Sequence, residues 1–204
     1  MVFKRHVEKV GGLTVSRNFY IADCHFGHAN VIKFDHRPFD SVEEMDRKMI
    51  DNWNNAVCQD DIVYILGDFC WNTEERWIEI LDKLNGNKIL IRGNHDLKTM
   101  SQQLRNKFQD IKDYKEVKDG GKRVLLSHYP MPFYRGAYNK DIVHLYGHIH
   151  VTLEHDFMEH IREYVNEYDD RGNSKHKCQF YNVGTMMPWM DYTPRTLDEI
   201  INFN

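Results

Sequence analysis

In the first half of the chain, short apolar runs alternate with longer segments in which apolar residues recur every three or four positions. The run at 62–66, Ile-Val-Tyr-Ile-Leu, is apolar throughout, which is typical of a β-strand covered on both faces. The segment before it has apolar residues at helical spacing, and Ser41 with Glu44 forms a capping box at its start. The alternation predicts parallel strands joined by right-handed crossovers, with functional residues at the strands' carboxyl ends. The predicted strands are 18–22, 62–66 and 89–91, and the predicted helices are 41–57 and 72–84, the second capped by Asn72.

The second half of the chain has a different pattern. Residues 114–118 and 122–126 flank Asp119-Gly120-Gly121 and predict a β-hairpin. Further strands are predicted at 142–146 and 178–183, a helix at about 154–168, and a short last helix capped by Thr196 and Glu199. Residues 2–7 are compatible with a strand, Gly11-Gly12 with a turn, and the polar segment 169–175 with a mobile loop.

Length and composition indicate a globular protein. The 204 residues are 41% hydrophobic, which is enough to form the core of a single domain over residues 1–204. No apolar run approaches the roughly 20 residues of a membrane-spanning helix, and the first residues lack the apolar block of a signal peptide. We therefore expect a cytoplasmic protein without a membrane partner. The cysteines are too scattered for a disulfide framework or a thiolate zinc site, so we expect reduced, structural thiols at Cys24, Cys58, Cys70 and Cys178.

The net charge of −4, with histidines neutral, argues against a broad basic surface and hence against long nucleic acid as a partner. It does not exclude a small anionic substrate, because two bound divalent cations would place four positive charges at one point.

Residues that can bind metals follow the predicted strands. They are Asp23 and His25, Asp68, Asn94 and His95, His128, and His148 with His150. In an extended segment, residues two apart point the same way, so the first pair and the last pair can each present two side chains to one point. Imidazole, carboxylate and amide ligands without thiolate suit Mn, Fe, Zn, Co or Ni. These candidates are too many for one ion and fit two octahedral-leaning ions that share a carboxylate.

Five sequence blocks resemble, in order, the pattern of the calcineurin-like metallophosphoesterases: D-x-H, G-D, G-N-H-D/E, a lone H and G-H-x-H. The blocks are Asp23-Cys24-His25, Gly67-Asp68, Gly93-Asn94-His95-Asp96, His128 and Gly147-His148-Ile149-His150. The resemblance extends from about residue 18 to residue 184, and it implies an α/β fold, a four-layer α/β-β/α sandwich of two mixed β-sheets flanked by helices.

The resemblance also implies a role for each residue. One metal ion would be held by Asp23, His25 and His150, and the second by Asn94, His128 and His148. Asp68 would bridge the two ions. Both would be transition metal ions, divalent or trivalent, with Mn favoured. A hydroxide bridging the ions would be the nucleophile. His95 would protonate the leaving oxygen, and Asp96 would orient the imidazole of His95 and raise its basicity.

Residues outside the shared pattern suggest substrate contacts. The stretch Phe26-Gly27-His28-Ala29-Asn30 looks like that of a subgroup of small bacterial and phage members. His28 or Asn30 could contact the substrate phosphate, and Arg37 could pair with it. The competing interpretation for all three is loop packing or a helix start. Asn182 is expected to orient the metal site without binding metal.

The resemblance therefore predicts a dinuclear metal-dependent phosphoesterase that hydrolyses phosphomonoesters or small phosphodiesters. Two alternatives stay open. One is a nuclease or cyclic-nucleotide phosphodiesterase, and the other is a binding scaffold on a degenerate phosphoesterase fold. The sequence does not indicate the oligomeric state.

Overall fold

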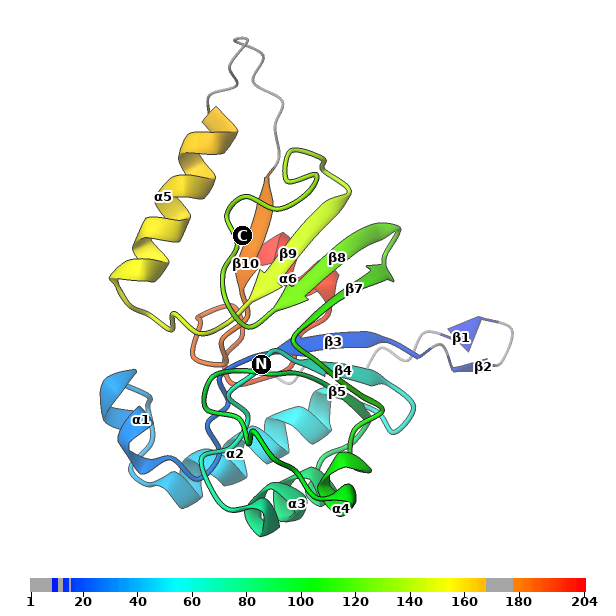
Figure 1. The fold of residues 1–204 in the computed structure, drawn as a ribbon, viewed down its shortest axis with the longest axis vertical. Helices are drawn as coiled ribbons and strands as arrows, with labels where there is room; N and C mark the ends of the chain where they lie inside the picture. Colours follow the sequence, from blue (N-terminus) through cyan, green and yellow to red (C-terminus); the bar gives the residue numbers. More distant parts are fainter. Residues whose placement is uncertain (1–8, 11–12, 15, 168–177) are drawn as a thin grey trace.

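Two four-stranded β-sheets lie face to face in the computed structural model, which describes residues 9–10, 13–14, 16–167 and 178–204 (Figure 1). The first sheet has the order β3-β4-β5-β6, and each neighbouring pair is parallel. Its strands are β3 (Asn18–Ile21), β4 (Ile62–Ile65), β5 (Asn87–Ile91) and β6 (Asp110–Lys112). The parallel arrangement follows from the strand–helix alternation of this half, as the sequence predicts.

The second sheet has the order β10-β9-β8-β7 and is mixed. Its first three strands are parallel to one another, and the hairpin places β7 antiparallel to β8. The strands are β7 (Tyr114–Asp119), β8 (Lys122–Ser127), β9 (Ile142–Tyr146) and β10 (Gln179–Asn182). The predicted hairpin and both later strands are thus confirmed.

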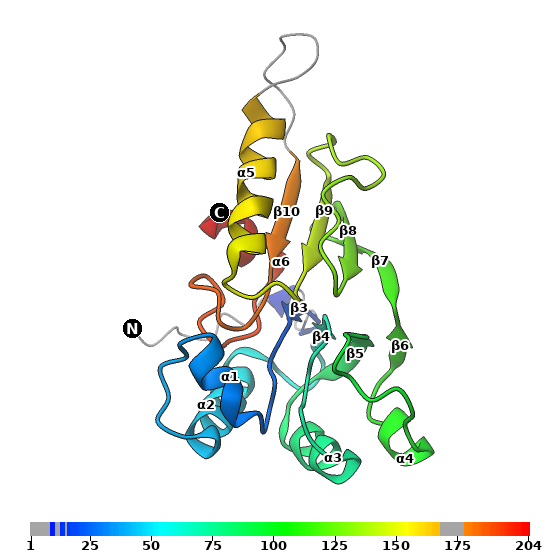
Figure 2. The same ribbon diagram turned by 60° about the vertical axis from the view of Figure 1, so that its left-hand side comes forward.

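Helices lie on the outer sides of both sheets, which gives the predicted four-layer sandwich, whereas the last helix packs next to β3 in the core that the sheets share (Figures 1 and 2). The helices are α1 (Ala29–Phe34), α2 (Val42–Ala56), α3 (Glu74–Lys83), α4 (Gln102–Arg105), α5 (Leu153–Glu167) and α6 (Leu197–Phe203). A small antiparallel pair, β1 (Lys9–Val10) and β2 (Leu13–Thr14), precedes the first sheet. None of the described helices is long and apolar enough to cross a membrane.

The second sheet is apolar on both faces, so it can pack against the first sheet on one side and against a helix on the other. Val124 and Leu126 of β8 belong to the core shared with the first sheet. Leu125, between them, packs in a separate outer core with Met158 of α5. Because neighbouring side chains of a strand point to opposite faces, one apolar run contributes to both cores.

The helix caps agree with the sequence at two of three predicted positions. The Ser41 hydroxyl accepts a hydrogen bond from the Glu44 N–H at 3.2 Å, and Thr196 with Glu199 forms a complete capping box. The cap at Asn72 is wrong. The N-cap of α3 is Thr73, which makes no side-chain cap bond, and the Asn72 carboxamide oxygen accepts the N–H of Thr73 at 3.3 Å.

The predictions for 2–7, Gly11-Gly12 and 169–175 lie outside the described residues. All four cysteines are free thiols, as expected.

Candidate metal centre

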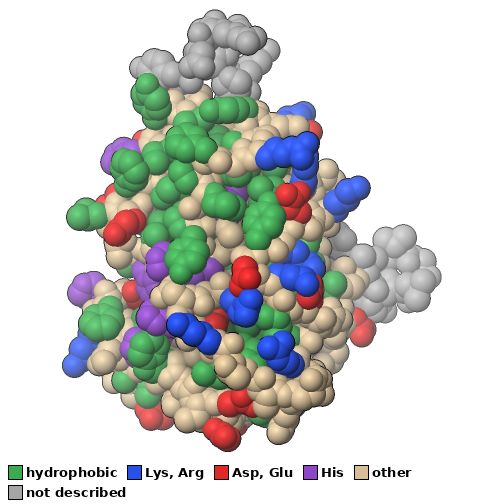
Figure 3. Space-filling view, viewed as in Figure 1, with side chains coloured by type: hydrophobic (Ala, Val, Ile, Leu, Met, Phe, Trp, Pro, Cys, Tyr) green, Lys and Arg blue, Asp and Glu red, His purple; other side chains and the backbone are tan. Residues whose placement is uncertain are grey.

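The predicted ligands gather where the carboxyl ends of the two sheets meet. Ala22, after β3, is hydrogen-bonded through its N–H to the carbonyl of Val183, after β10, at 2.8 Å. This contact joins the ends of the two sheets, since β3 belongs to the first and β10 to the second. Figure 3 shows histidine side chains gathered on one face at the level at which the sheets meet.

The ligand-type residues form two groups. Asp23, His25 and His150 form one, and Asp68, His128 and His148 form the other. Within each group, one ligand atom from every residue lies within 4.8 Å of the others. Each group takes residues from both sheets.

Asp68 lies between the two groups. Its Oδ2 is 3.7 Å from Nε2 of His25 in the first group and 3.5 Å from Nε2 of His128 in its own. Its Oδ1 accepts the backbone N–H of His95 at 2.9 Å, which fixes the carboxylate. Asn94 extends the second group, with its Oδ1 3.0 Å from Nε2 of His128.

The hydrogen bonds of the imidazoles leave electron pairs directed into the centre. Nδ1 of His128 lies 2.8 Å from the carbonyl oxygen of Leu66. Because a carbonyl only accepts, this nitrogen carries the proton and Nε2 presents a lone pair. That lone pair faces Oδ1 of Asn94, a second acceptor, at 3.0 Å. Two acceptors at this distance are stabilised by a cation between them, so these residues fit a metal ion.

His150 is oriented by a carboxylate that the sequence analysis did not single out. Its Nδ1 lies 2.7 Å from Oδ1 of Asp35, and an ionised carboxylate only accepts, so Nδ1 carries a proton and, in the neutral imidazole, Nε2 is left to bind an ion. Burial alone would lower the pKa of His150, but the Asp35 hydrogen bond and the charges of Asp23 and Asp35 outweigh it and raise that pKa. No motif marked Asp35, because it is close to His150 only in the folded chain.

Burial sets the protonation of other members of the centre. It raises the pKa of the Asp23 carboxyl to about 6, although His150 and His128 act in the opposite direction. It also lowers the pKa values of His25 and His148, which favours the neutral imidazoles that bind metals.

Five of the seven predicted ligands have left-handed backbone conformations. Their φ angles lie between 46° and 74°: Asp23, His25, Asp68, His148 and His150. The extended geometry assumed for the first and last pairs is therefore wrong, and His148 and His150 belong to different groups. Such φ angles cost of order 1 kcal/mol or more per residue, so the surrounding contacts must hold them.

Glycines bring the backbone against the ligand atoms. A Cβ on Gly67 would lie closer than 3.0 Å to Nδ1 of His128, and one on Gly93 equally close to Oδ1 of Asp68. A Cβ on Gly147 would lie 2.6 Å from Oδ2 of Asp23. The glycines of the sequence blocks thus make room for the ligands.

Arg37 does not have the predicted substrate role. Its side chain is fully buried and donates to Oδ2 of Asp35 at 2.8 Å, to the carbonyl of Asp23 at 2.9 Å and to that of Cys24 at 3.0 Å. Its donors are therefore used inside the protein, and the packing interpretation is correct. Arg37 holds both the Asp23 backbone and the carboxylate that orients His150.

Asp96 also differs from the prediction. Its two oxygens accept the backbone N–H groups of Phe69 at 2.9 Å and Gly93 at 2.7 Å, and among the described residues it makes no hydrogen bond with His95. The carboxylate ties the two loops of the first sheet together and does not orient the imidazole. His95 itself is exposed beside the centre, with its ring 5.9 Å from that of His25.

His28 and Asn30 mark the start of α1. His28 is the N-cap residue, and its ring stacks on Trp71 with 4.2 Å between the ring centroids. Asn30 is exposed in the first turn. Among the described residues, neither side chain bonds to the ligand groups. Asn182 has the expected supporting contact, since its carboxamide donates to the carbonyl of His150 at 3.0 Å.

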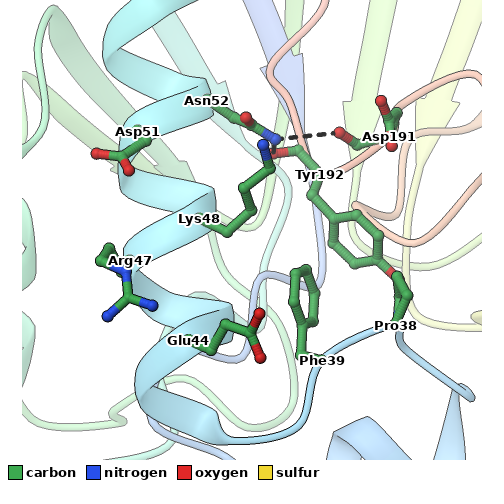
Figure 4. A pocket seen from close by; sticks show the side chains of 9 residues that line it. All are labelled: Pro38, Phe39, Glu44, Arg47, Lys48, Asp51, Asn52, Asp191 and Tyr192. Carbon is green, nitrogen blue, oxygen red and sulfur yellow. Dashed lines mark hydrogen bonds between the residues drawn. The ribbon is translucent and has the colours of Figure 1, made fainter.

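A cavity of about 420 Å³ lies elsewhere, against α2 (Figure 4). Arg47, Lys48 and Asp51 of α2 and Tyr192 of the segment before α6 are among its lining residues. None of the predicted site residues lines this cavity, so it is separate from the metal centre.

The four-layer sandwich, with Asp, Asn and His side chains at the meeting edge of its sheets, defines an α/β protein with a candidate metal centre. The family model of the calcineurin-like phosphoesterase superfamily domain matches residues 19–197, and the chain belongs to that superfamily.

Relatives come from archaea, phages and bacteria. The chain is 35% identical over 156 residues to the uncharacterized protein MJ1445 of Methanocaldococcus jannaschii, covering 76% of this chain and 82% of the relative. It is 27% identical to the Gene 66 protein of Mycobacterium phage D29, covering 76% of this chain and 99% of the phage protein. The solved structure of the protein of unknown function AQ665 from Aquifex aeolicus has 27% identity and a TM-score of 0.60, covering 93% of this chain and all of that one.

Proposed function

We propose that this protein is a two-metal hydrolase that cleaves phosphomonoesters or small phosphodiesters, with Mn²⁺ as the favoured ion. The observation that carries the proposal is the position of Asp68, whose Oδ2 lies within 3.7 Å of His25 and 3.5 Å of His128. A carboxylate between two groups of ligands is the arrangement that two neighbouring ions require. The degenerate-scaffold alternative is weaker, because all seven predicted ligands are present and six of them form the two groups.

When bound, two such ions would polarise the phosphoryl oxygens and lower the pKa of the attacking water. The protein's own residues would do the rest. His95 is exposed next to the centre, while its backbone N–H is fixed by Asp68 at 2.9 Å. The imidazole of His95 would donate a proton from one ring nitrogen to the leaving oxygen of the ester. In this role the His95 side chain would need no buried hydrogen-bond partner, because it is exposed and can reach a leaving group at the surface.

The substrate is proposed to be small. A net charge of −4 does not favour a long polyanion, and Arg37, the predicted phosphate partner, is turned into the protein.

The test is metal-dependent turnover. Protein stripped with a chelator and reloaded with Mn²⁺, Zn²⁺, Co²⁺, Ni²⁺ or Fe²⁺ should hydrolyse p-nitrophenyl phosphate or bis(p-nitrophenyl) phosphate, and the stripped protein should not. Comparison of an oligonucleotide with a mononucleotide distinguishes a nuclease. The absence of turnover with every metal would contradict the proposal.

Two variants separate metal binding from proton donation. Asp68→Asn should lose metal and activity together, because one charge of the shared ligand is removed. His95→Asn should retain both ions by metal analysis, while kcat falls by about 10²–10⁴-fold, the range for loss of a general acid. If His95→Asn emptied the site, the role of His95 would be wrong.

A further inference from the structure

Three aromatic side chains stand in a row beside His95, and we call them the aromatic wall: Phe34, His28 and Trp71. The rings of His28 and Trp71 are stacked, with centroids 4.2 Å apart and an interplanar angle of 11°. Phe34 meets His28 edge-on at 6.4 Å, and the Trp71 ring lies 4.9 Å from the ring of His95. Figure 3 shows hydrophobic side chains next to the histidine cluster on this face.

The wall is built on a rigid base. Its two loops continue the pairing of β3 with β4: the N–H of His25 donates to the carbonyl of Asp68 at 2.9 Å, and the N–H of Phe26 to that of Phe69 at 3.0 Å. The Trp71 N–H then donates back to the carbonyl of Phe26 at 2.9 Å. The stacked pair is therefore fixed relative to the ligands Asp68 and His25, which is what a preorganised subsite needs.

The wall is open to solvent although it is apolar. Trp71 is 46% exposed and Phe34 is 71% exposed. Folding leaves these two large rings uncovered beside His95, and apolar surface beside polar groups is typical of ligand sites.

Arg37, the predicted phosphate partner, does not face the wall. His28 has a buried Nδ1 with no hydrogen-bond partner among the described residues. Arg37, which follows α1, points inward to Asp35. The stacked rings next to His95 therefore present an aromatic surface that suits a planar group.

We propose that the aromatic wall is the leaving-group subsite and that it takes phosphoesters whose leaving alcohol carries a planar aromatic or heteroaromatic ring. This inference rests on the proposed function, because it places the leaving group by the position of His95. The ring would pack against Trp71 while the ester oxygen reaches the His95 imidazole.

The experiment uses substrate pairs that differ in the ring and share the type of leaving oxygen. Benzyl phosphate is compared with cyclohexylmethyl phosphate, and a nucleoside 5′-monophosphate with ribose 5-phosphate, on Mn²⁺-loaded protein. If the protein hydrolyses only diesters, the methyl diesters of the same alcohols replace these monoesters. In at least one pair, kcat/KM of the aromatic substrate should be about five- to tenfold higher than that of its non-aromatic partner. This factor corresponds to the free energy of one aromatic contact. A preference in the first pair alone indicates a simple aryl group, and in the second pair alone a nucleobase.

Trp71→Leu tests the wall directly, because it keeps apolar bulk and removes the aromatic face. It should abolish the aromatic preference, mainly by raising KM for the aromatic member of each pair relative to its non-aromatic partner. Phe34→Leu, at a more exposed position, should reduce the preference without a risk to folding. Phe203→Leu on α6 is the matched control, since Phe203 is 68% exposed and has no ring contact with the centre among the described residues.

A binding measurement separates this inference from the proposed function. Calorimetry with benzylphosphonate and cyclohexylmethylphosphonate needs no turnover. Preferential binding of the benzyl compound, lost in Trp71→Leu, would support the subsite even if no ester were hydrolysed. Equal binding of both compounds, or a preference that survives in Trp71→Leu, would overturn the inference while leaving phosphoester hydrolysis intact.

Discussion

Arg37, Asp35 and His150 form a chain of contacts that ends at the metal centre. The guanidinium holds the Asp35 carboxylate at 2.8 Å, and the carboxylate holds Nδ1 of His150 at 2.7 Å. Burial alone would raise the pKa of Asp35, but His150 and Arg37 together lower it, so the carboxylate stays ionised. The buried pair thus fixes which nitrogen of His150 faces the candidate metal centre.

Asp35→Asn should therefore weaken metal binding without removing a ligand. The neutral carboxamide holds the imidazole less firmly, and we expect Mn²⁺ affinity to fall by about 10–100-fold in a calorimetric titration. Asp51→Asn, at an exposed carboxylate of α2, is the control and should bind as the wild type does. Unchanged affinity in Asp35→Asn would show that the contact does not orient His150.

At the level of residues, the sequence predicted the ligands better than their supports. Asp23, His25, Asp68, His128, His148 and His150 come together as two groups, because block motifs and strand ends mark them. Asp35, Arg37 and Asp96 act through contacts between distant segments, which spacing along the chain does not reveal. The chemistry of Arg37 suggested an exposed phosphate contact, but its burial decides otherwise.

The loops after the strands are the elements that carry the site. They are short and left-handed, and their glycines lie directly against ligand atoms. The sequence predicted the long strands and helices from their periodicity. It missed α1, α4 and β6, which have six, four and three residues, because fewer than two helical turns or a few strand positions give no periodic signal.

Gly93→Ala should disturb both stability and metal binding. The added methyl group would overlap the Asp68 carboxylate and approach His128, so we expect a loss of about 1–3 kcal/mol in the free energy of unfolding and a clear loss of Mn²⁺ affinity. Urea unfolding and calorimetry measure the two effects.

Gly121→Ala is the matched control for this change. Gly121 has a φ of 77° in the hairpin turn, and nothing lies within 4 Å of its added Cβ. The variant should lose about 1 kcal/mol of stability through backbone strain and keep its metal affinity. If Gly93→Ala bound Mn²⁺ normally, close packing at Gly93 would not matter to the site.

The whole molecule is two sheets joined at one edge by shared ligands. Asp23, His25 and Asp68 belong to loops of the first sheet, and His128, His148 and His150 to loops of the second. Strand ends predicted that these residues would lie near one another. The face-to-face contact of the sheets could not be predicted from local patterns, because it depends on the complementary packing of both apolar faces.

Metal binding should therefore stabilise the entire fold. Mn²⁺ at 100 times its dissociation constant contributes about 2.7 kcal/mol per site, which corresponds to a rise of about 5–10 °C in the thermal midpoint of a protein of this size. Asp68→Asn should lose most of this rise. Asp113→Asn, an exposed carboxylate paired with Arg92, should retain it. An equal rise in both variants would mean that the ions act elsewhere.

The division of ligands between the sheets also determines when the centre is completed during synthesis. The chain leaves the ribosome from its N-terminus, so α1–α4 and the first sheet, up to Lys112, emerge before any ligand of the second. At that stage the chain contains Asp23, His25, Asp68 and Asn94 but none of the three histidines of the second sheet. Only when the loop after β9 emerges does the chain contain His150 as well as Asp35, so the proposed metal centre would be completed late in translation.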